Sequence, residues 1–392
     1  MPDIQTDLPG TAKKYTQRGR RLVFFTGGTA LREVSRELAR HTEDSAHLVT
    51  TFDSGGSSAA LRRAFAMPAV GDIRNRLLAL AHPSIPEGVL DFCSARLPED
   101  APQDELRREL LGCGDEAHPV WRTMSLDFAG PLRDLLRCFL ERMPRDFDPR
   151  RAAYGNLALA GGYLRYKRDF GPVLAVFSRL LRLRGVVEPI VKESLHLAAQ
   201  LDNDEVVSGQ HYFRSLTRPV RRVFLSVHEP WKSSAPSVPE APPVSCRPPL
   251  AAPAAALLES PRAVIYPMGS FYSSLLATLL PRGVGSAIAR ADCPKIFIPN
   301  TGDDSESRGL SLVGQCRALL GYLGKDTERK GDFLRYVLVD SRNGRYHGLG
   351  PQTRKELAAL GVELVDENMV CPDNPQRHDP QRTVDALLRL AA

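Results

Sequence analysis

The chain has 392 residues, of which 43% are hydrophobic and 25% are charged, an ordinary composition for a globular protein. Its net charge of +6 comes mostly from scattered arginines without interleaved aromatic residues, so we expect no nucleic-acid binding. The seven cysteines are dispersed without a C-x-x-C pair, and no apolar run could span a bilayer, which argues against a disulfide framework, a structural zinc site and membrane association.

The N-terminal part of the sequence predicts a flexible arm followed by alternating strands and helices. Residues 1–20 are polar and basic and lack the apolar core of a signal peptide, so we expect a cytoplasmic protein. Residues 21–25 are typical of a buried strand, and a glycine turn and a helix over 31–40 follow. Residues 47–52 begin the same succession again. This alternation predicts a parallel sheet with crossover helices.

The middle of the chain has a different pattern. Residues 71–81 predict a further helix, and residues 84–200 are mostly helical in pattern, which predicts a helical middle layer. Shorter strand patterns lie at 185–191 and 221–227. The proline density of residues 233–256 then predicts a surface loop without regular structure.

The parallel pattern returns in the C-terminal part. Four strand patterns with helix-like stretches between them precede a closing helix near 383–390; the strand patterns are 262–270, 295–303, 336–340 and 362–366. The sequence therefore predicts an α/β fold: a Rossmann-like, mostly parallel sheet with helices on both faces and a helical middle insertion. We expect a single domain over residues 21–392, with ligands bound where the strands release their loops.

Glycine-rich loops follow several of these strands. Glycines let backbone N–H groups approach an anion, and the start of a helix adds a favourable dipole, so such loops can hold phosphate. Each loop alone also fits a plain turn, but their presence at the ends of different strands favours a ligand site. The loops lie at 26–29, 53–58, 268–270 and 300–303.

Charged residues beside these loops indicate how a phosphate could be handled. A carboxylate at Asp53 would repel a phosphate unless a cation lay between them, which makes Asp53 a candidate Mg²⁺ ligand; a turn aspartate is the alternative. Arg74 can offer a bidentate fork to phosphate oxygens. Asp72 is expected either to orient Arg74 or a water, or to cap the helix.

Five motifs, in a fixed order, resemble a known family. They resemble the 2-phospho-L-lactate transferase (CofD-type) superfamily and, within it, the YvcK-like branch of gluconeogenesis factors, over about residues 21–345. The motifs are GGTAL at 27–31, DSGGSSA at 53–59, GDIRN at 71–75, GNL at 155–157 and PMGSFYSS at 267–274.

The resemblance implies a domain that binds a nucleotide diphosphate or a nucleotide sugar and that could form a homodimer. In the transferase branch, a 2-phospholactyl group moves from a guanosine nucleotide to a deazaflavin hydroxyl with Mg²⁺. In the YvcK-like branch, the ligand is a UDP-sugar, and the role is regulatory, in carbon use and cell-wall balance. Both functions stay open at this point: a Mg²⁺-dependent phosphoryl-group transferase with an unknown acceptor, or a non-catalytic binding protein.

The residues and the resemblance together define a predicted site. Asp53 and Arg74 form its reaction centre, with Asp53 near the metal. The predicted phosphate-binding residues are Gly27, Gly28, Thr29, Gly55, Gly56, Ser57, Ser58, Asp72, Asn75, Asn156, Gly269, Ser270 and Asn300.

The chain also departs from the family pattern. Ala30 and Met268 replace a glycine and a proline, and Ser54 replaces a second aspartate, which removes a possible metal ligand. The segment after Asn300 differs from the M-T-Q-x-G-E-T type sequence of the YvcK-like branch. These departures suggest a divergent subgroup, such as the CofD-like proteins associated with the GAK gene system.

Overall fold

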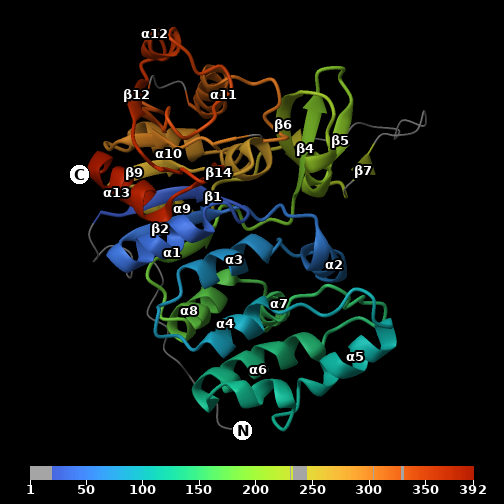
Figure 1. Cartoon of the computed structure of the whole chain (residues 1–392). Helices are drawn as coiled ribbons and strands as arrows, with labels where there is room; N and C mark the ends of the chain where they lie inside the picture. The colour runs from blue at the N-terminus through green and yellow to red at the C-terminus, as the bar shows by residue number, and fades with distance from the viewer. Residues whose placement is uncertain (1–19, 230, 233–244, 303, 328–330) are drawn as a thin grey trace.

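A seven-stranded parallel sheet organises the molecule, of which the computed structural model describes residues 20–229, 231–232, 245–302, 304–327 and 331–392 (Figure 1). The arm expected at 1–20 lies outside these residues, apart from Arg20. The sheet has the order β12-β11-β10-β9-β1-β2-β3. Its strands are β1 (Leu22–Thr26), β2 (Ser45–Val49), β3 (Val186–Pro189), β9 (Ala263–Tyr266), β10 (Lys295–Phe297), β11 (Tyr336–Val339) and β12 (Glu363–Asp366).

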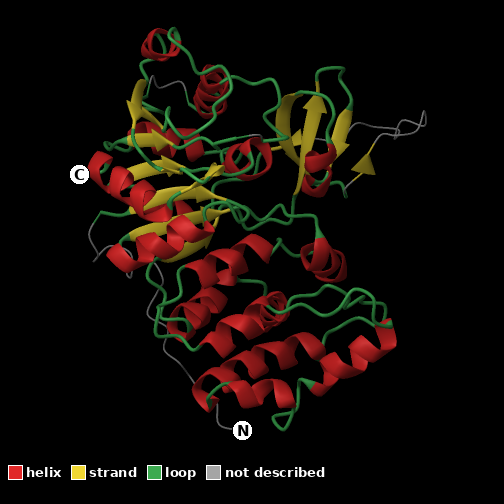
Figure 2. Cartoon of the chain, viewed as in Figure 1, coloured by secondary structure: helices red, strands yellow, loops and turns green. Residues whose placement is uncertain are grey.

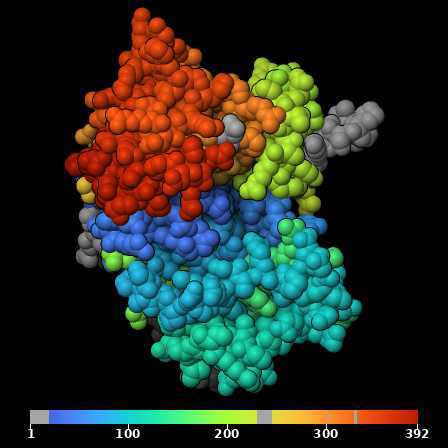
Figure 3. Space-filling model, viewed as in Figure 1, coloured from blue at the N-terminus to red at the C-terminus, as the bar shows by residue number. Residues whose placement is uncertain are grey.

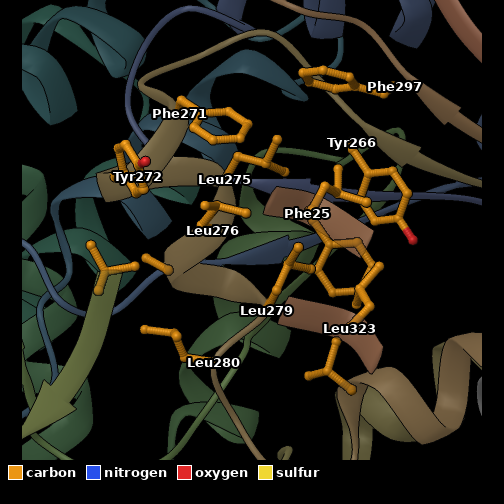
Figure 4. Close-up of a cluster of buried hydrophobic side chains, with 14 of the residues drawn as sticks. Phe25, Tyr266, Phe271, Tyr272, Leu275, Leu276, Leu279, Leu280, Phe297 and Leu323 are labelled. Carbon is orange, nitrogen blue, oxygen red and sulfur yellow. The ribbon is translucent and has the colours of Figure 1, made fainter. Parts of the chain in front are cut away.

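Successive side chains along a strand point to opposite faces of the sheet, and helices cover both faces. Leu22 and Phe24 of β1 join a core that includes α1 (Arg32–His41) and α13 (Pro380–Leu390). Val23 and Phe25 point into the opposite core, part of which Figure 4 shows. That core is covered by η4 (Phe271–Leu276), α10 (Val284–Arg290), α11 (Leu312–Gly324) and α12 (Thr353–Ala358). The predicted fold class is thus confirmed.

The helical layer is inserted between β2 and β3 and has a hydrophobic core of its own. It ends at Leu180 rather than near residue 200, because a turn through Gly185 (φ +153°) leads into β3 of the sheet. Its elements are α2 (Gly56–Phe65), α3 (Gly71–Ala79), α4 (Glu87–Ser94), α5 (Gln103–Gly112), η2 (Pro119–Thr123), α6 (Leu126–Leu140), α7 (Tyr154–Arg165) and α8 (Phe170–Leu180). Figure 2 shows this layer as an all-helical end of the molecule.

A second sheet, which the sequence reading missed, is antiparallel and has the order β7-β5-β4-β6-β8. The strand pattern at 221–227 does form a strand, β6, but it belongs to this sheet. Most of these strands are too short to show alternation in the sequence. The elements are β4 (His196–Leu201), β5 (Val206–Ser208), η3 (Gln210–Ser215), β6 (Val220–Ser226), β7 (Trp231–Lys232) and β8 (Ser245–Cys246); a separate hairpin joins β13 (Val370–Cys371) and β14 (Asn374–His378).

The proline-rich stretch corrects another expectation. Residues 233–244 lie outside the described part, but β8 and the helix α9 (Ala252–Leu257) occupy the end of the stretch. Pro253 lies in the first turn of α9, where a missing N–H breaks no helical hydrogen bond. The prediction of a loop without regular structure over 233–256 was therefore wrong for residues 245–246 and 252–256.

The connections of the sheet indicate where a ligand would lie. From β1 the chain proceeds outward through β2 and β3, then returns to β9 on the other side of β1. Open α/β sheets bind ligands at such a reversal of strand order. In Figure 3 the blue segment that follows residue 20 lies beside the red C-terminal segment, and the helical layer forms the opposite end of the molecule. Within the described residues, no helix is long and apolar enough to cross a membrane.

Candidate functional site

A cavity of about 340 Å³ lies where three helices of the helical layer begin. The first turns of α2, α3 and α7 contribute to its wall, and the first N–H groups of a helix have no partner within the helix. Such helix starts favour an anion. The cavity is lined by Asp53, Gly55, Gly56, Ser57, Ser58, Gly71, Arg74, Asn75, Arg96, Arg151 and Asn156. The structure thus brings together the predicted residues of the DSGGSS, GDIRN and GNL motifs, apart from Asp72.

Asp53 lies in this cavity in a tight turn, where its Oδ1 accepts a hydrogen bond of 2.9 Å from the Gly55 N–H. Its Oδ2 and the Ser58 Oγ lie 2.9 and 2.8 Å from the point that a Cβ on Gly71 would occupy. An alanine at position 71 would therefore fill the space between these two oxygens. Glycine is required here by this close approach of oxygen atoms.

Asp53, Ser58 and Asn156 bring oxygen atoms to the cavity that would suit a Mg²⁺ ion. Ser58 Oγ and Asn156 Oδ1 are buried and have no hydrogen-bond partner among the described residues. A carboxylate, a hydroxyl and an amide oxygen are hard donors of the type that Mg²⁺ prefers. Asn156 is held in place because its Nδ2 donates a hydrogen bond of 2.8 Å to Ser57 Oγ.

Arg74 supplies positive charge from within the wall of the cavity. Its side chain is buried, and Nη2 donates to Asn75 Oδ1 at 2.9 Å. Nε and Nη1 have no hydrogen-bond partner in the described structure. Burial, and then the neighbouring Arg96, lower the pKa of Arg74 to about 10, which still leaves it charged at neutral pH. A buried cation with unused donors is the expected partner of an anionic ligand.

Asp72 has a different role from the two that the sequence suggested. It neither lines the cavity nor caps α3; its Oδ2 accepts a hydrogen bond of 2.7 Å from Thr50 Oγ1, and its carboxylate also accepts from the Gly28 N–H. Burial, and then the charge of Asp53, raise the pKa of Asp72 to about 6. Asp72 therefore anchors the loop after β1 next to the cavity.

The loops at the strand reversal form a second group of predicted residues, and none of them lines the cavity. A Cβ on Gly27 would lie 3.2 Å from Ser274 Cα, so the loop after β1 packs directly on η4. The Gly269 N–H donates to Asn300 Oδ1 at 2.8 Å, and Asn300 Nδ2 donates to the Gly269 carbonyl at 2.7 Å. The members of this group are Gly27, Gly28, Thr29, Gly269, Ser270 and Asn300.

Two carboxylates accept hydrogen bonds from the N–H groups at the start of η4. Asp304 Oδ2 accepts from the Phe271 N–H at 3.0 Å. Glu306 Oε2 accepts from the N–H groups of Tyr272 (3.1 Å) and Ser273 (2.8 Å). Glu306 is buried, and this burial raises its pKa. The sequence suggested that N–H groups of this loop bind phosphate, but these groups are thus bound by carboxylates of the protein itself.

The sequence reading missed two arginines of the cavity. Arg96 and Arg151 both come from the helical layer, and Arg96 Nη1 donates to the Arg151 carbonyl at 3.0 Å. Arg96 carries no motif signal, whereas Arg151 lies five residues before Asn156 and could have been considered with it. Ser54 points out of the cavity, since its Oγ lies 2.8 Å from His211 Nδ1 of η3.

Comparisons with known proteins agree with the motifs. The family model of 2-phospho-L-lactate transferase CofD matches residues 22–370. The gluconeogenesis factor of Bacillus subtilis is 25% identical over 94% of this chain and 98% of its own length. A putative gluconeogenesis factor of Nostoc is 24% identical over 96% of this chain and 70% of its own. The crystal structure of a UPF0052 family member from Bacillus halodurans superposes with a TM-score of 0.67, at 20% identity, over 94% of this chain and 99% of that one.

Proposed function

The chain belongs to the CofD family, and from this premise we propose that it binds the diphosphate of a nucleotide-linked ligand together with Mg²⁺ in the cavity described above. We further propose that it acts as a transferase of the 2-phospho-L-lactate type. An acceptor hydroxyl oxygen bonds to the phosphorus of the phosphoryl-linked group, the bond from that phosphorus to the nucleoside monophosphate breaks, and the hydroxyl proton passes to solvent. The observation that carries the proposal is Arg74, a buried cation with two unused donor nitrogens that lines the same cavity as Asp53.

The side chains of the cavity divide the work of such a transfer. Asp53, Ser58 Oγ and Asn156 Oδ1 would hold the Mg²⁺, and the bound ion supplies charge neutralisation for the phosphates. Arg74 binds phosphate oxygens, and the first N–H groups of α2 and α3 add donors at fixed positions. Little covalent work is required of the protein, because phosphoryl transfer depends mainly on positioning and on stabilisation of charge.

A second function is favoured by the names of the relatives. The Bacillus subtilis relative is called a gluconeogenesis factor, and its similarity extends over nearly the whole of both chains. In this alternative, the cavity binds a UDP-sugar without turnover, and the protein acts as a regulator of carbon metabolism or cell-wall balance. Formation of a product from a nucleotide donor would distinguish the transferase from the regulator.

Thermal stabilisation tests binding before any acceptor is known. We expect one of UDP, GDP, UDP-N-acetylglucosamine and GTP to raise Tm with Mg²⁺, since a ligand at about 100 times its Kd stabilises the folded state by about 2.7 kcal/mol. Asp53→Asn should abolish the Mg²⁺-dependent part of the shift. Asp100→Asn, at an exposed position outside the cavity, is the matched control and should keep it. Absence of any shift, or an equal shift in Asp53→Asn, would contradict the proposal.

A further inference from the structure

Arg151 holds an unusual backbone conformation at the cavity. Its φ of +61° is in the left-handed region, which is unfavourable for a residue with a side chain. Two hydrogen bonds fix this conformation: the Arg151 N–H donates to the Leu97 carbonyl at 3.0 Å, and Arg96 Nη1 donates to the Arg151 carbonyl. Strained residues persist where the surrounding structure enforces them, and they cluster at functional sites.

The side chain of Arg151 is weakly held in its present position. It pairs with Glu99 at 3.1 Å, and the two side chains are 61% and 60% exposed. Pairs this exposed contribute little to stability. Arg151 lines the cavity, whereas Glu99 does not. An arginine of this kind can exchange one carboxylate partner for another anion at small cost.

Arg74 and Arg151 therefore lie at different depths of the same cavity. Arg74 is 5% exposed and forms part of the buried wall, whereas Arg151 lies at the solvent side. Two arginines at two depths of one cavity offer one bidentate fork to each of two successive phosphates. Arg96 donates a hydrogen bond to the Arg151 carbonyl and so positions the backbone of Arg151 at the solvent side of the cavity.

We propose that Arg151 binds the outer phosphate of the ligand in exchange for Glu99, while Arg74 binds the inner one. Arg151 is then the residue by which the cavity prefers nucleoside diphosphates over monophosphates. The inference rests on the proposed function, since it assumes that phosphate binds in this cavity. It adds a specificity-determining residue that no motif of the sequence contains.

Pairs of ligands that differ by one phosphate provide the test. Affinities are measured by calorimetry with Mg²⁺ for UMP and UDP, for GMP and GDP, and for orthophosphate and pyrophosphate. We expect the full chain to prefer the member with two phosphates. Arg151→Gln should reduce that preference about 10-fold, the size expected for one charge-assisted bidentate contact, and should leave the binding of the monophosphates unchanged.

Further variants separate recognition from structure. Arg151→Gly suits a positive φ, so its Tm should be no lower than that of the parent while the diphosphate preference falls as in Arg151→Gln. Glu99→Gln should tighten diphosphate binding about 2- to 3-fold, because Arg151 no longer has to leave a carboxylate. Arg150→Gln is the matched control: Arg150 is the adjacent arginine, pairs with Asp148 and does not line the cavity.

The possible outcomes distinguish this inference from the proposed function. If nucleotides bind but Arg151→Gln keeps the parental preference for two phosphates, the role of Arg151 is overturned and the proposed function stands. A drop in preference of equal size in Arg150→Gln would also overturn it, because the effect would then be one of net charge. If none of the phosphate ligands binds to the parent chain, both proposals fall.

Discussion

The loops after β1 and β9 and the turns that begin α2 and α3 are built from the same residue types, yet their polar groups have different partners. At the loops, N–H donors of Gly28, Gly269 and the first turn of η4 are bound by side chains of the protein. At the cavity, Arg74 and Ser58 keep buried polar atoms without partners. These unpartnered side-chain atoms support the cavity, rather than the loops, as the proposed ligand site.

Of the substitutions that test this difference between the two regions, one at Glu306 is expected to have the largest effect on stability. Glu306→Ala should lower the free energy of unfolding by about 3 kcal/mol, because it leaves the N–H groups of Tyr272 and Ser273 buried without acceptors. Urea unfolding measures this loss. Glu259→Ala, at an exposed position, is the control, and its free energy of unfolding should stay within about 0.5 kcal/mol of the parent. A loss below about 1 kcal/mol would show that the carboxylate is dispensable and that this loop is open to a ligand.

At the cavity, Arg74 should show the opposite combination of effects. Arg74→Met should weaken binding of the nucleotide that stabilises the parent about 30- to 100-fold, since it removes a charge-assisted contact of about 2–3 kcal/mol. Stability without ligand should be equal or higher, because a buried charge with unused donors is replaced by an apolar chain. Calorimetry and urea unfolding measure the two quantities. Lower stability with unchanged binding would make Arg74 structural.

The pH dependence of stability should reveal Asp72, which lies between the two regions. Its pKa is about 6 in the folded protein against 3.8 for the free group, so between these pH values the folded state binds more protons than the unfolded state. Stability should therefore fall as pH rises from 4 to 6. Asp72→Asn should remove about 1–2 kcal/mol of this fall.

Unfolding curves at half-unit pH steps measure the effect, and the same curves with added Mg²⁺ provide a second test. A cation bound at Asp53 would lower the pKa of Asp72 and so reduce the slope in the parent chain. Equal slopes in the parent and in Asp72→Asn would show that Asp72 already titrates at its ordinary pKa. The anchoring of the β1 loop would then not depend on a buried charge.

The smallest effect is expected at Asn300. Asn300→Ala removes its two hydrogen bonds to the backbone of Gly269 and should cost about 1 kcal/mol, since water can reach this half-buried position. Nucleotide affinity should stay within twofold of the parent. A large loss of affinity with unchanged stability would instead assign Asn300 to the ligand, as the sequence suggested.

Much of the fold could be predicted because it depends on local patterns. The strands of the parallel sheet are short apolar runs such as Leu22–Thr26, and the glycine turns and helix patterns after β1 and β2 are readable without knowledge of the fold. The antiparallel sheet was missed because strands such as Val206–Ser208 are too short to show a period of two. The proline at the start of α9 was misread because proline ends a helix only beyond its first turn.

The site could be predicted only in part, for a related reason. The motifs identified Asp53, Arg74 and Asn156 because their residue types and spacing resemble a family. Which loops keep their donors free depends on distant residues: Glu306 binds N–H groups more than thirty positions earlier in the chain. Arg151 lies only five residues before Asn156 in the sequence, but the positive φ that marks it is visible only in the structure.

The order of strands also has a consequence for the synthesis of the protein. β1 pairs with β9, so that Leu22 lies opposite Ala263, and the centre of the sheet cannot form until most of the chain has left the ribosome. The helical layer occupies one continuous segment, residues 56–180, and has a core of its own, so it can fold before β9 has been made. The helical layer, which carries Arg74 and Arg151, would thus fold first during synthesis, before β1 can pair with β9.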